Sequence, residues 1–285
     1  MGYAGSVTVP SPGEPPPLLK DLDHTRVQKR WRWWIHVILI TAYPLVVGAL
    51  SLTSGRRVGP ALGTNTKTLL AVVVIEVATF GLIFALAWIS SRASRNDLLL
   101  AWHPRFWTIP LGLAYSVALR LAVAVGLGGI LAVLLVFRAL TLEQLKQFLL
   151  DNRPDVGALV DIAALKNDPF YFWITVTLVS FLVGGLREEL WRSAFLAGFR
   201  HVLPARFSSF SGQLLAVAAA ALVFGLGHLS QGILAVGLTG CLGFGLGLIM
   251  ILHRSIWPAV FAHGFFDAAS LAVLPYVADK LPNLT

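Results

Sequence analysis

Long apolar stretches dominate the chain, and short polar or charged segments separate them. Seven of these stretches are long enough, or nearly so, to cross about 30 Å of hydrocarbon as helices. They cover residues 33–52, 68–90, 109–136, 169–186, 210–228, 232–252 and 256–275. The pattern predicts an all-α protein, a polytopic bundle of about seven to eight transmembrane helices.

Two segments depart from this pattern. Residues 1–32 contain prolines and basic residues and no long apolar run, so we expect a disordered, basic cytoplasmic tail. Residues 33–280 then form the transmembrane bundle. The one long connection, residues 137–168, carries mixed charges, which indicates a short amphipathic helix on the membrane surface.

Composition supports a membrane protein. Hydrophobic residues make up 56% of the chain and charged residues 13%, against about 25% charged residues in soluble domains. So few charges cannot cover the surface of a soluble enzyme of this size. The formal net charge of +8 suits loops that lie on anionic lipid headgroups, so we expect membrane lipid, and no nucleic acid, as a partner. Basic residues are more numerous on the side of the tail, which favours a cytoplasmic N-terminus.

Several common classes of site are absent from the sequence. The single cysteine, Cys241, excludes an intrachain disulfide and a cysteine-based metal cluster. The chain has no His-Glu-x-x-His motif, no nucleophile elbow and no phosphate-binding loop. No internal repeat supports a transporter built from duplicated halves. Gly243 and Gly247 have the small-xxx-small spacing that predicts close helix packing.

Ionisable residues within or beside the apolar stretches are costly in hydrocarbon and therefore indicate function. They are Glu76, Arg120, Glu188, Glu189, His228, His263 and Asp267. Most of them lie in the last hundred residues, on three consecutive predicted helices. This clustering predicts one polar site between those helices.

The adjacent Glu188 and Glu189 are the first candidates for chemistry. On a helix their side chains point about 100° apart, so the two can reach one polar cavity only near its edge. Arg192 lies four residues after Glu188, on the same helix face, and can hold that carboxylate in place. The alternative is a solvated interfacial turn that closes the helix, with Arg187 and Arg192 contacting lipid headgroups.

Two histidines follow on the later helices. A lone histidine such as His228, at the end of an apolar stretch, is commonly a satisfied core or interfacial residue. His263 and Asp267 are one helical turn apart and face the same way, and a carboxylate beside an imidazole fixes its tautomer and orientation. Burying this pair in lipid without a partner would cost several kcal/mol, so the pair indicates a functional site.

Together the three motifs resemble the CPBP family of intramembrane proteases, which includes the Rce1-like CaaX prenyl endopeptidases and bacterial homologues linked to bacteriocin immunity. The family has an EExxxR-type element, then FxxxH, then HxxxN or HxxxD, on successive transmembrane helices. The resemblance covers about residues 165–280. The matching positions are Glu188, Glu189, Phe224, His228, His263 and Asp267. It implies an all-helical bundle with its site in a membrane cavity open to the cytosol, here in a bacterial inner membrane.

One position departs from the family pattern. The family's arginine falls five residues after the first glutamate, where this chain has Ser193, and Arg192 stands one place earlier. In an alternative register, Glu188 takes the place of the second glutamate and Arg187 that of the first. Which of Glu188 and Glu189 is the base is therefore open.

The resemblance implies hydrolysis of a peptide bond by an activated water. Glu188 or Glu189 would accept the water proton, and His228 would hold the water or the same carboxylate. His263 and Asp267 would form the site that stabilises the oxyanion. A divalent metal such as zinc, held by Glu188, His228 and His263, would also suit these residue types, so the sequence leaves a metal-free and a metal-dependent mechanism open.

Two other functions remain compatible with these residues. A decayed site could serve a non-catalytic immunity or scaffold protein of the same family, which the displaced Arg192 would favour. A proton-coupled transporter could use Glu76, Arg120, His228 and His263 as a relay. For the protease, we expect a peptide or a membrane protein as the substrate, and the sequence does not indicate which one.

Overall fold

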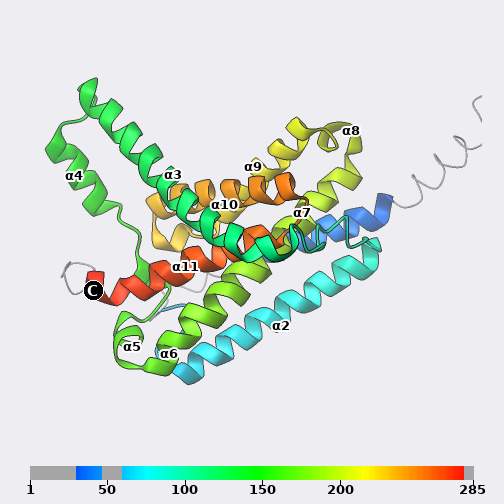
Figure 1. The fold of residues 1–285 in the computed structure, drawn as a ribbon, viewed down its shortest axis with the longest axis horizontal. Coiled ribbons are helices and arrows are strands. Elements are labelled where there is room, and N and C mark those ends of the chain that lie inside the picture. The colour runs from blue at the N-terminus through cyan, green and yellow to red at the C-terminus, as the bar shows by residue number, and fades with distance from the viewer. Residues whose placement is uncertain (1–29, 47–59, 279–285) are drawn as a thin grey trace, which may run out of the picture.

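The computed structural model describes residues 30–46 and 60–278, and every regular element in these two ranges is helical (Figure 1). A helix over residues 30–46 is followed by α2 (Thr66–Ser91), a 3-10 turn η1 (Arg105–Trp107), α3 (Thr108–Val136), α4 (Leu142–Asp151), η2 (Val156–Ala158), α5 (Ile162–Asn167), α6 (Pro169–Ile174), η3 (Thr175–Arg187), α7 (Glu188–Val202), α8 (Pro204–Phe207), α9 (Phe210–Leu226), η4 (Leu229–Gln231), α10 (Ile233–His253) and α11 (Trp257–Ala278).

The predicted all-α polytopic bundle is confirmed. Each of the seven apolar stretches is helical over its described residues, apart from one or two residues at an end of the last three stretches. Five helices of the described part are long and apolar enough to cross a membrane, and α9 is a shorter apolar helix. The outward faces of α2 and α3 carry many exposed large apolar side chains, as expected for helices that contact lipid. The chain is therefore an integral membrane protein.

The tail and the long connection were the two segments predicted to lie outside the bundle. Residues 1–29 of the predicted tail are outside the described residues, and the helix over residues 30–46 already includes Arg32. The 137–168 connection contains the predicted short helix: α4 begins at a Thr141 cap, buries Leu145 and leaves Leu142 and Phe148 exposed. Figure 1 shows α4 beside the far end of α3, away from the other helices.

The helix that carries the glutamate pair is longer than its apolar stretch. The stretch was predicted to end at residue 186, but α6, η3 and α7 form one continuous helix, Pro169–Val202. Its middle third, η3, is wound as a π-helix, and the Ser180 hydroxyl donates to the Thr175 carbonyl oxygen at 3.0 Å. The glutamates thus begin a further helical segment, and the alternative of an interfacial turn that closes the helix is wrong.

Close helix crossings bring the elements of the site together. An ideal Cβ on Gly185 of η3 would lie 2.8 Å from the Val260 carbonyl oxygen, so α11 crosses η3 at a position that only glycine permits. The predicted close packing at Gly243 and Gly247 is confirmed, because a Cβ there would lie 2.7 Å from atoms of Phe224 and Val217. Glycines thus allow α11 to approach η3 and α10 to approach α9.

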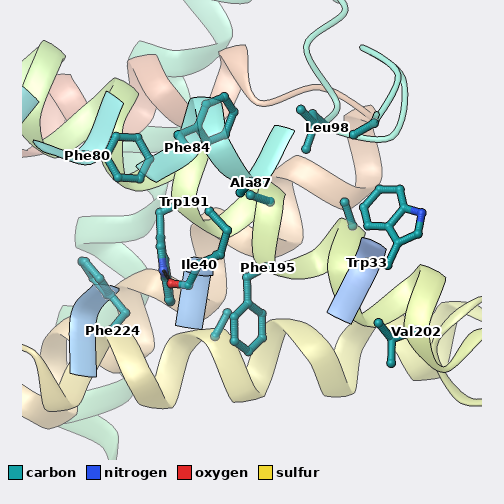
Figure 2. Packing of buried hydrophobic residues seen from close by; sticks show 14 residues of the cluster. Trp33, Ile40, Phe80, Phe84, Ala87, Leu98, Trp191, Phe195, Val202 and Phe224 are labelled. Atoms are coloured by element: carbon teal, nitrogen blue, oxygen red, sulfur yellow. Dashed lines mark hydrogen bonds between the residues drawn. The ribbon is translucent and has the colours of Figure 1, made fainter. Parts of the chain in front are cut away.

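A buried apolar cluster holds the N-terminal helices against α7. Figure 2 shows Trp33 and Ile40 from the helix over residues 30–46, Phe84 from α2, and Trp191 and Phe195 from α7 in this cluster. Polar side chains add specific links between the same helices, because His36 lies 3.0 Å from the carbonyl oxygens of both Ala87 and Ala194. The start of α7 is therefore supported from outside the segment that resembles the protease family.

Candidate active site

Glu188 and Glu189 open α7 directly after the π-helical segment, and they have different surroundings. The Glu189 side chain is fully buried, whereas 18% of the Glu188 side chain is exposed. Adjacent side chains on a helix diverge by about 100°, which separates the two environments. Only Glu188 therefore has access to solvent or to a substrate.

Arg192 forms a buried ion pair with Glu189. Its Nη1 contacts Glu189 Oε2 at i,i+3 spacing, and both side chains are fully buried. The remaining guanidinium surface lies over the Phe224 ring, 5.0 Å from its centroid. The prediction that Arg192 can hold Glu188 is wrong, as is a contact of Arg192 with lipid headgroups. Residues three and four apart lie on the same helix face, so the spacing alone did not distinguish the two glutamates.

His263 lies among three carboxylates. Its Nδ1 donates to Glu189 Oε1 at 3.1 Å, and its Nε2 lies 3.7 Å from Glu188 Oε2 and 3.5 Å from Asp267 Oδ2. Only 4% of the imidazole side chain is exposed. The structure thus brings together four of the five predicted catalytic residues: Glu188, Glu189, His263 and Asp267.

Arg187 holds the other oxygen of Glu188. The Arg187 Nη2 donates to Glu188 Oε1 at 2.9 Å, and its Nη1 donates to Glu76 Oε2 of α2 at 2.9 Å. The predicted alternative, in which Arg187 contacts lipid headgroups, is therefore wrong. The sequence alone does not identify Arg187 as part of the site, although Glu76 stands out as an ionisable residue in an apolar stretch. The two residues are far apart in sequence, so no local pattern connects them.

His228 lies near this cluster and contacts Phe224. Its Nδ1 donates to the Phe224 carbonyl oxygen at 3.0 Å, and this leaves Nε2 available to accept a hydrogen bond. The Phe224 ring stands edge-on to the rings of His228 and His263, at centroid distances of 4.9 Å and 6.0 Å. Within the described residues, His228 makes no direct hydrogen bond to a carboxylate of the site.

Glu76 and Arg120 have different direct partners, and Glu76 pairs with Arg187. Arg120 donates to the Ser116 hydroxyl at 2.6 Å and to main-chain carbonyl oxygens of Phe265 and Phe266 in α11. Its guanidinium also lies 4.3 Å from the centroid of the Phe266 ring. The two residues therefore do not pair with each other, and the contacts described give no direct link between them for a proton relay.

The site residues do not form a metal-binding set. In the ranges 30–46 and 60–278, no group of three or more His, Cys, Asp or Glu side chains is arranged to hold a metal ion. Glu188 and His263 approach each other, whereas among the described residues His228 makes no ion pair with Glu188, Glu189 or Asp267. The conditional zinc set of Glu188, His228 and His263 thus does not fit this geometry.

A comparison with protein families agrees with the motifs. Residues 169–269 match the family model described as type II CAAX prenyl endopeptidase, Rce1-like. No curated protein and no solved structure gave a significant match. The matched segment contains every predicted catalytic residue together with Arg187 and Arg192, and Glu76 lies outside it. The resemblance to the Rce1-like proteases is confirmed, and it supports a membrane-embedded endopeptidase.

Proposed function

We propose, from the premise that residues 169–269 are an Rce1-like segment, that this protein is an intramembrane endopeptidase whose base is Glu188. One observation carries the assignment. Glu188 Oε1 is held by Arg187, while Oε2 is directed to His263 Nε2 at 3.7 Å and belongs to a partly exposed side chain. Glu189 is fully buried, and its two oxygens are used by Arg192 and His263. Glu188 is therefore the glutamate that can take a proton from water.

In the proposed reaction, Glu188 Oε2 accepts a proton from a water molecule, and the water oxygen attacks the carbonyl carbon of the scissile bond. His228 Nε2 can accept a hydrogen bond from the same water, because its proton is on Nδ1. The carbon–nitrogen bond breaks when the leaving amine takes the proton that Glu188 received. Both protons of the water molecule thus end on the products, and Glu188 is again a carboxylate.

The oxyanion that forms during the attack needs a hydrogen-bond donor. His263 Nε2 supplies it, and Glu189 and Asp267 orient the ring from opposite sides. Removing one such donor typically costs about 3–4 kcal/mol of transition-state stabilisation. The buried Glu189–Arg192 pair thus acts through His263, and the one-place displacement of the arginine is accommodated by i,i+3 pairing.

The substrate class and the membrane orientation follow from the same proposal. The site lies on membrane-spanning helices, so a peptide that is lipid-anchored or part of a membrane protein can reach it from the bilayer. The distribution of basic residues supports a cytoplasmic N-terminus, and we assign the protein to a bacterial inner membrane.

The experiment is hydrolysis of quenched fluorescent peptides, with and without a prenyl group, by purified protein in lipid vesicles. Glu188→Gln should reduce the rate about 10²–10⁴-fold, because a general base contributes that much. Glu143→Gln removes a carboxylate on α4 and serves as the matched control, with a wild-type rate expected.

The thermal unfolding temperature of each variant separates loss of catalysis from loss of folding. A Glu188→Gln protein that cleaves at the wild-type rate would reject Glu188 as the base. If folded wild-type protein cleaves none of the peptides, the immunity or scaffold function becomes the better account.

A further inference from the structure

Glu76 is a carboxylate in the middle of a long apolar helix. It lies in α2, which has 26 residues, and a charged group there is costly unless it is paired. Its side chain is 38% exposed, and its ion-pair partner is Arg187 of η3. Glu76 is outside the Rce1-like segment, so neither the three motifs nor the family match gives it a role.

Arg187 connects this carboxylate to the base. Its guanidinium donates from two different nitrogens, Nη1 to Glu76 and Nη2 to Glu188, and both distances are 2.9 Å. A planar guanidinium with two anchored nitrogens is fixed in orientation, whereas one with a single partner can rotate about its flexible stem. Glu76, beside the Tyr43 hydroxyl that also interacts with Arg187, therefore helps to fix how Arg187 presents its second nitrogen.

The orientation of Glu188 depends on this connection. Arg187 binds Oε1, and the carboxylate plane then directs Oε2 toward His263 Nε2 at 3.7 Å. Arg187 is only 17% exposed, so water has limited access to replace a lost partner. The contacts form a chain from α2 to α11 through Glu76, Arg187, Glu188 and His263.

We propose that Glu76 is a positioning residue for the hydrolytic reaction: by anchoring Arg187 from α2, it fixes the carboxylate of Glu188 in the orientation that directs Oε2 at the reacting water. This inference rests on the proposed function and extends it to a helix outside the Rce1-like segment. Glu76 does not touch the reacting atoms itself. It acts through Arg187.

The test measures kcat and KM separately for Glu76→Gln and Glu76→Asp in lipid vesicles. Glu76→Gln keeps the size of the side chain but weakens its hold on Arg187, so kcat should fall roughly 10- to 100-fold while KM stays the same. Glu76→Asp keeps the charge and should recover part of the loss. Glu143→Gln on α4 again serves as the control.

A double variant tests whether Glu76 acts through Arg187. Arg187→Lys replaces the planar guanidinium, whose two nitrogens bind different carboxylates, by a single ammonium group, so it should lower kcat too. If the two residues form one chain, Glu76→Gln combined with Arg187→Lys should be no slower than the worse single variant. An unchanged kcat in Glu76→Gln, a change confined to KM, or losses that multiply would each overturn the proposal.

A second measurement does not depend on hydrolysis. Modification of Glu188 by a water-soluble carbodiimide, located by mass spectrometry, should become at least severalfold faster in Glu76→Gln, because the carboxylate is less firmly held. An unchanged modification rate would overturn the positioning role. Failure of the wild-type protein to cleave peptides would refute the proposed function alone, since the modification experiment still decides the role of Glu76.

Discussion

At the scale of single residues, the adjacent glutamates show how neighbours in sequence acquire different tasks. Glu189 is fully buried beside Arg192. The Glu188 side chain is partly exposed, and its Oε2 is directed toward His263 Nε2. A buried carboxylate whose two oxygens contact Arg192 and His263 is structural, because protonating it would leave the paired arginine uncompensated. The partly exposed carboxylate is the one free to exchange a proton.

Glu189→Gln should therefore destabilise the protein more than Glu188→Gln does. Removing one partner of a buried ion pair typically costs about 3–5 kcal/mol, and here it leaves Arg192 charged and without compensation. Chemical unfolding in detergent micelles measures the difference. The double variant Glu189→Gln, Arg192→Met should recover much of the loss, because it removes both charges. Equal unfolding free energies for the two single variants would contradict the assignment of Glu189.

Sequence reasoning identified the residues of the site but not all of their partners. The spacing of His263 and Asp267 predicted a facing pair, which the structure has at 3.5 Å. The partner of Arg192 could not be predicted, since residues at i+3 and i+4 are both within reach and side-chain rotamers decide between them. The contact of Arg187 with Glu76 depends on how η3 packs against α2, which no local spacing encodes.

At the scale of elements, the π-helical segment and its crossing with α11 position the site. Gly185 lies in η3, and α11 passes so close that the Val260 carbonyl oxygen would be 2.8 Å from a Cβ at this position. Because the neighbouring atom is main chain, it cannot move without moving α11. The crossing therefore fixes the distance between the carboxylate of Glu188 and the imidazole of His263.

Gly185→Ala should separate η3 from α11 and lower the hydrolytic rate by roughly tenfold or more, because small displacements of catalytic groups are costly. Gly81→Ala in α2 is the matched control, since nothing lies within 4 Å of a Cβ there. Replacing that glycine should leave the rate unchanged and raise stability slightly, because alanine favours the helix. Initial rates and thermal unfolding temperatures of both variants give the comparison. A fully active Gly185→Ala protein would show that the crossing does not set the site geometry.

The apolar pattern predicted the membrane helices well but not the continuity of the glutamate-bearing helix. The apolar stretches coincide with helices because hydrocarbon requires every main-chain polar group to be bonded within the segment. The helix Pro169–Val202 continues past residue 186 because the charged residues that follow pair with each other, Arg187 with Glu188 and Arg192 with Glu189. No pattern in the sequence predicts that η3 is wound as a π-helix.

At the scale of the whole molecule, the Rce1-like segment is supported by helices that lie outside it. The helix over residues 30–46 and α2 pack on α7 through the cluster in Figure 2, and His36 reaches carbonyl oxygens of both α2 and α7. Composition predicted the membrane location correctly, since so few charges cannot surround a soluble fold. The N-terminal helices support the site, whereas the reacting groups lie in the Rce1-like segment. Variants in the N-terminal helices should therefore alter the stability of the protein and the position of Glu188.

Metal removal tests whether the proposed reaction needs a bound metal ion. Because the proposed base, Glu188, acts on water directly, we expect a strong chelator to leave the rate of peptide hydrolysis unchanged. The measurement is the initial rate before and after dialysis against the chelator, with zinc added back to one sample. A rate that falls on dialysis and returns with zinc would contradict a mechanism driven by Glu188 and water alone.

The most direct test of the central claim is the origin of the oxygen in the new carboxyl group. Excess protein is mixed with peptide in water enriched in oxygen-18, and the product of a single turnover is analysed by mass spectrometry. If water activated by Glu188 attacks the peptide carbonyl directly, the new carboxyl group should contain one atom of oxygen-18 from that first turnover. A first-turnover product without oxygen-18 would contradict the account, because its oxygen would have come from a carboxylate of the protein acting as a nucleophile.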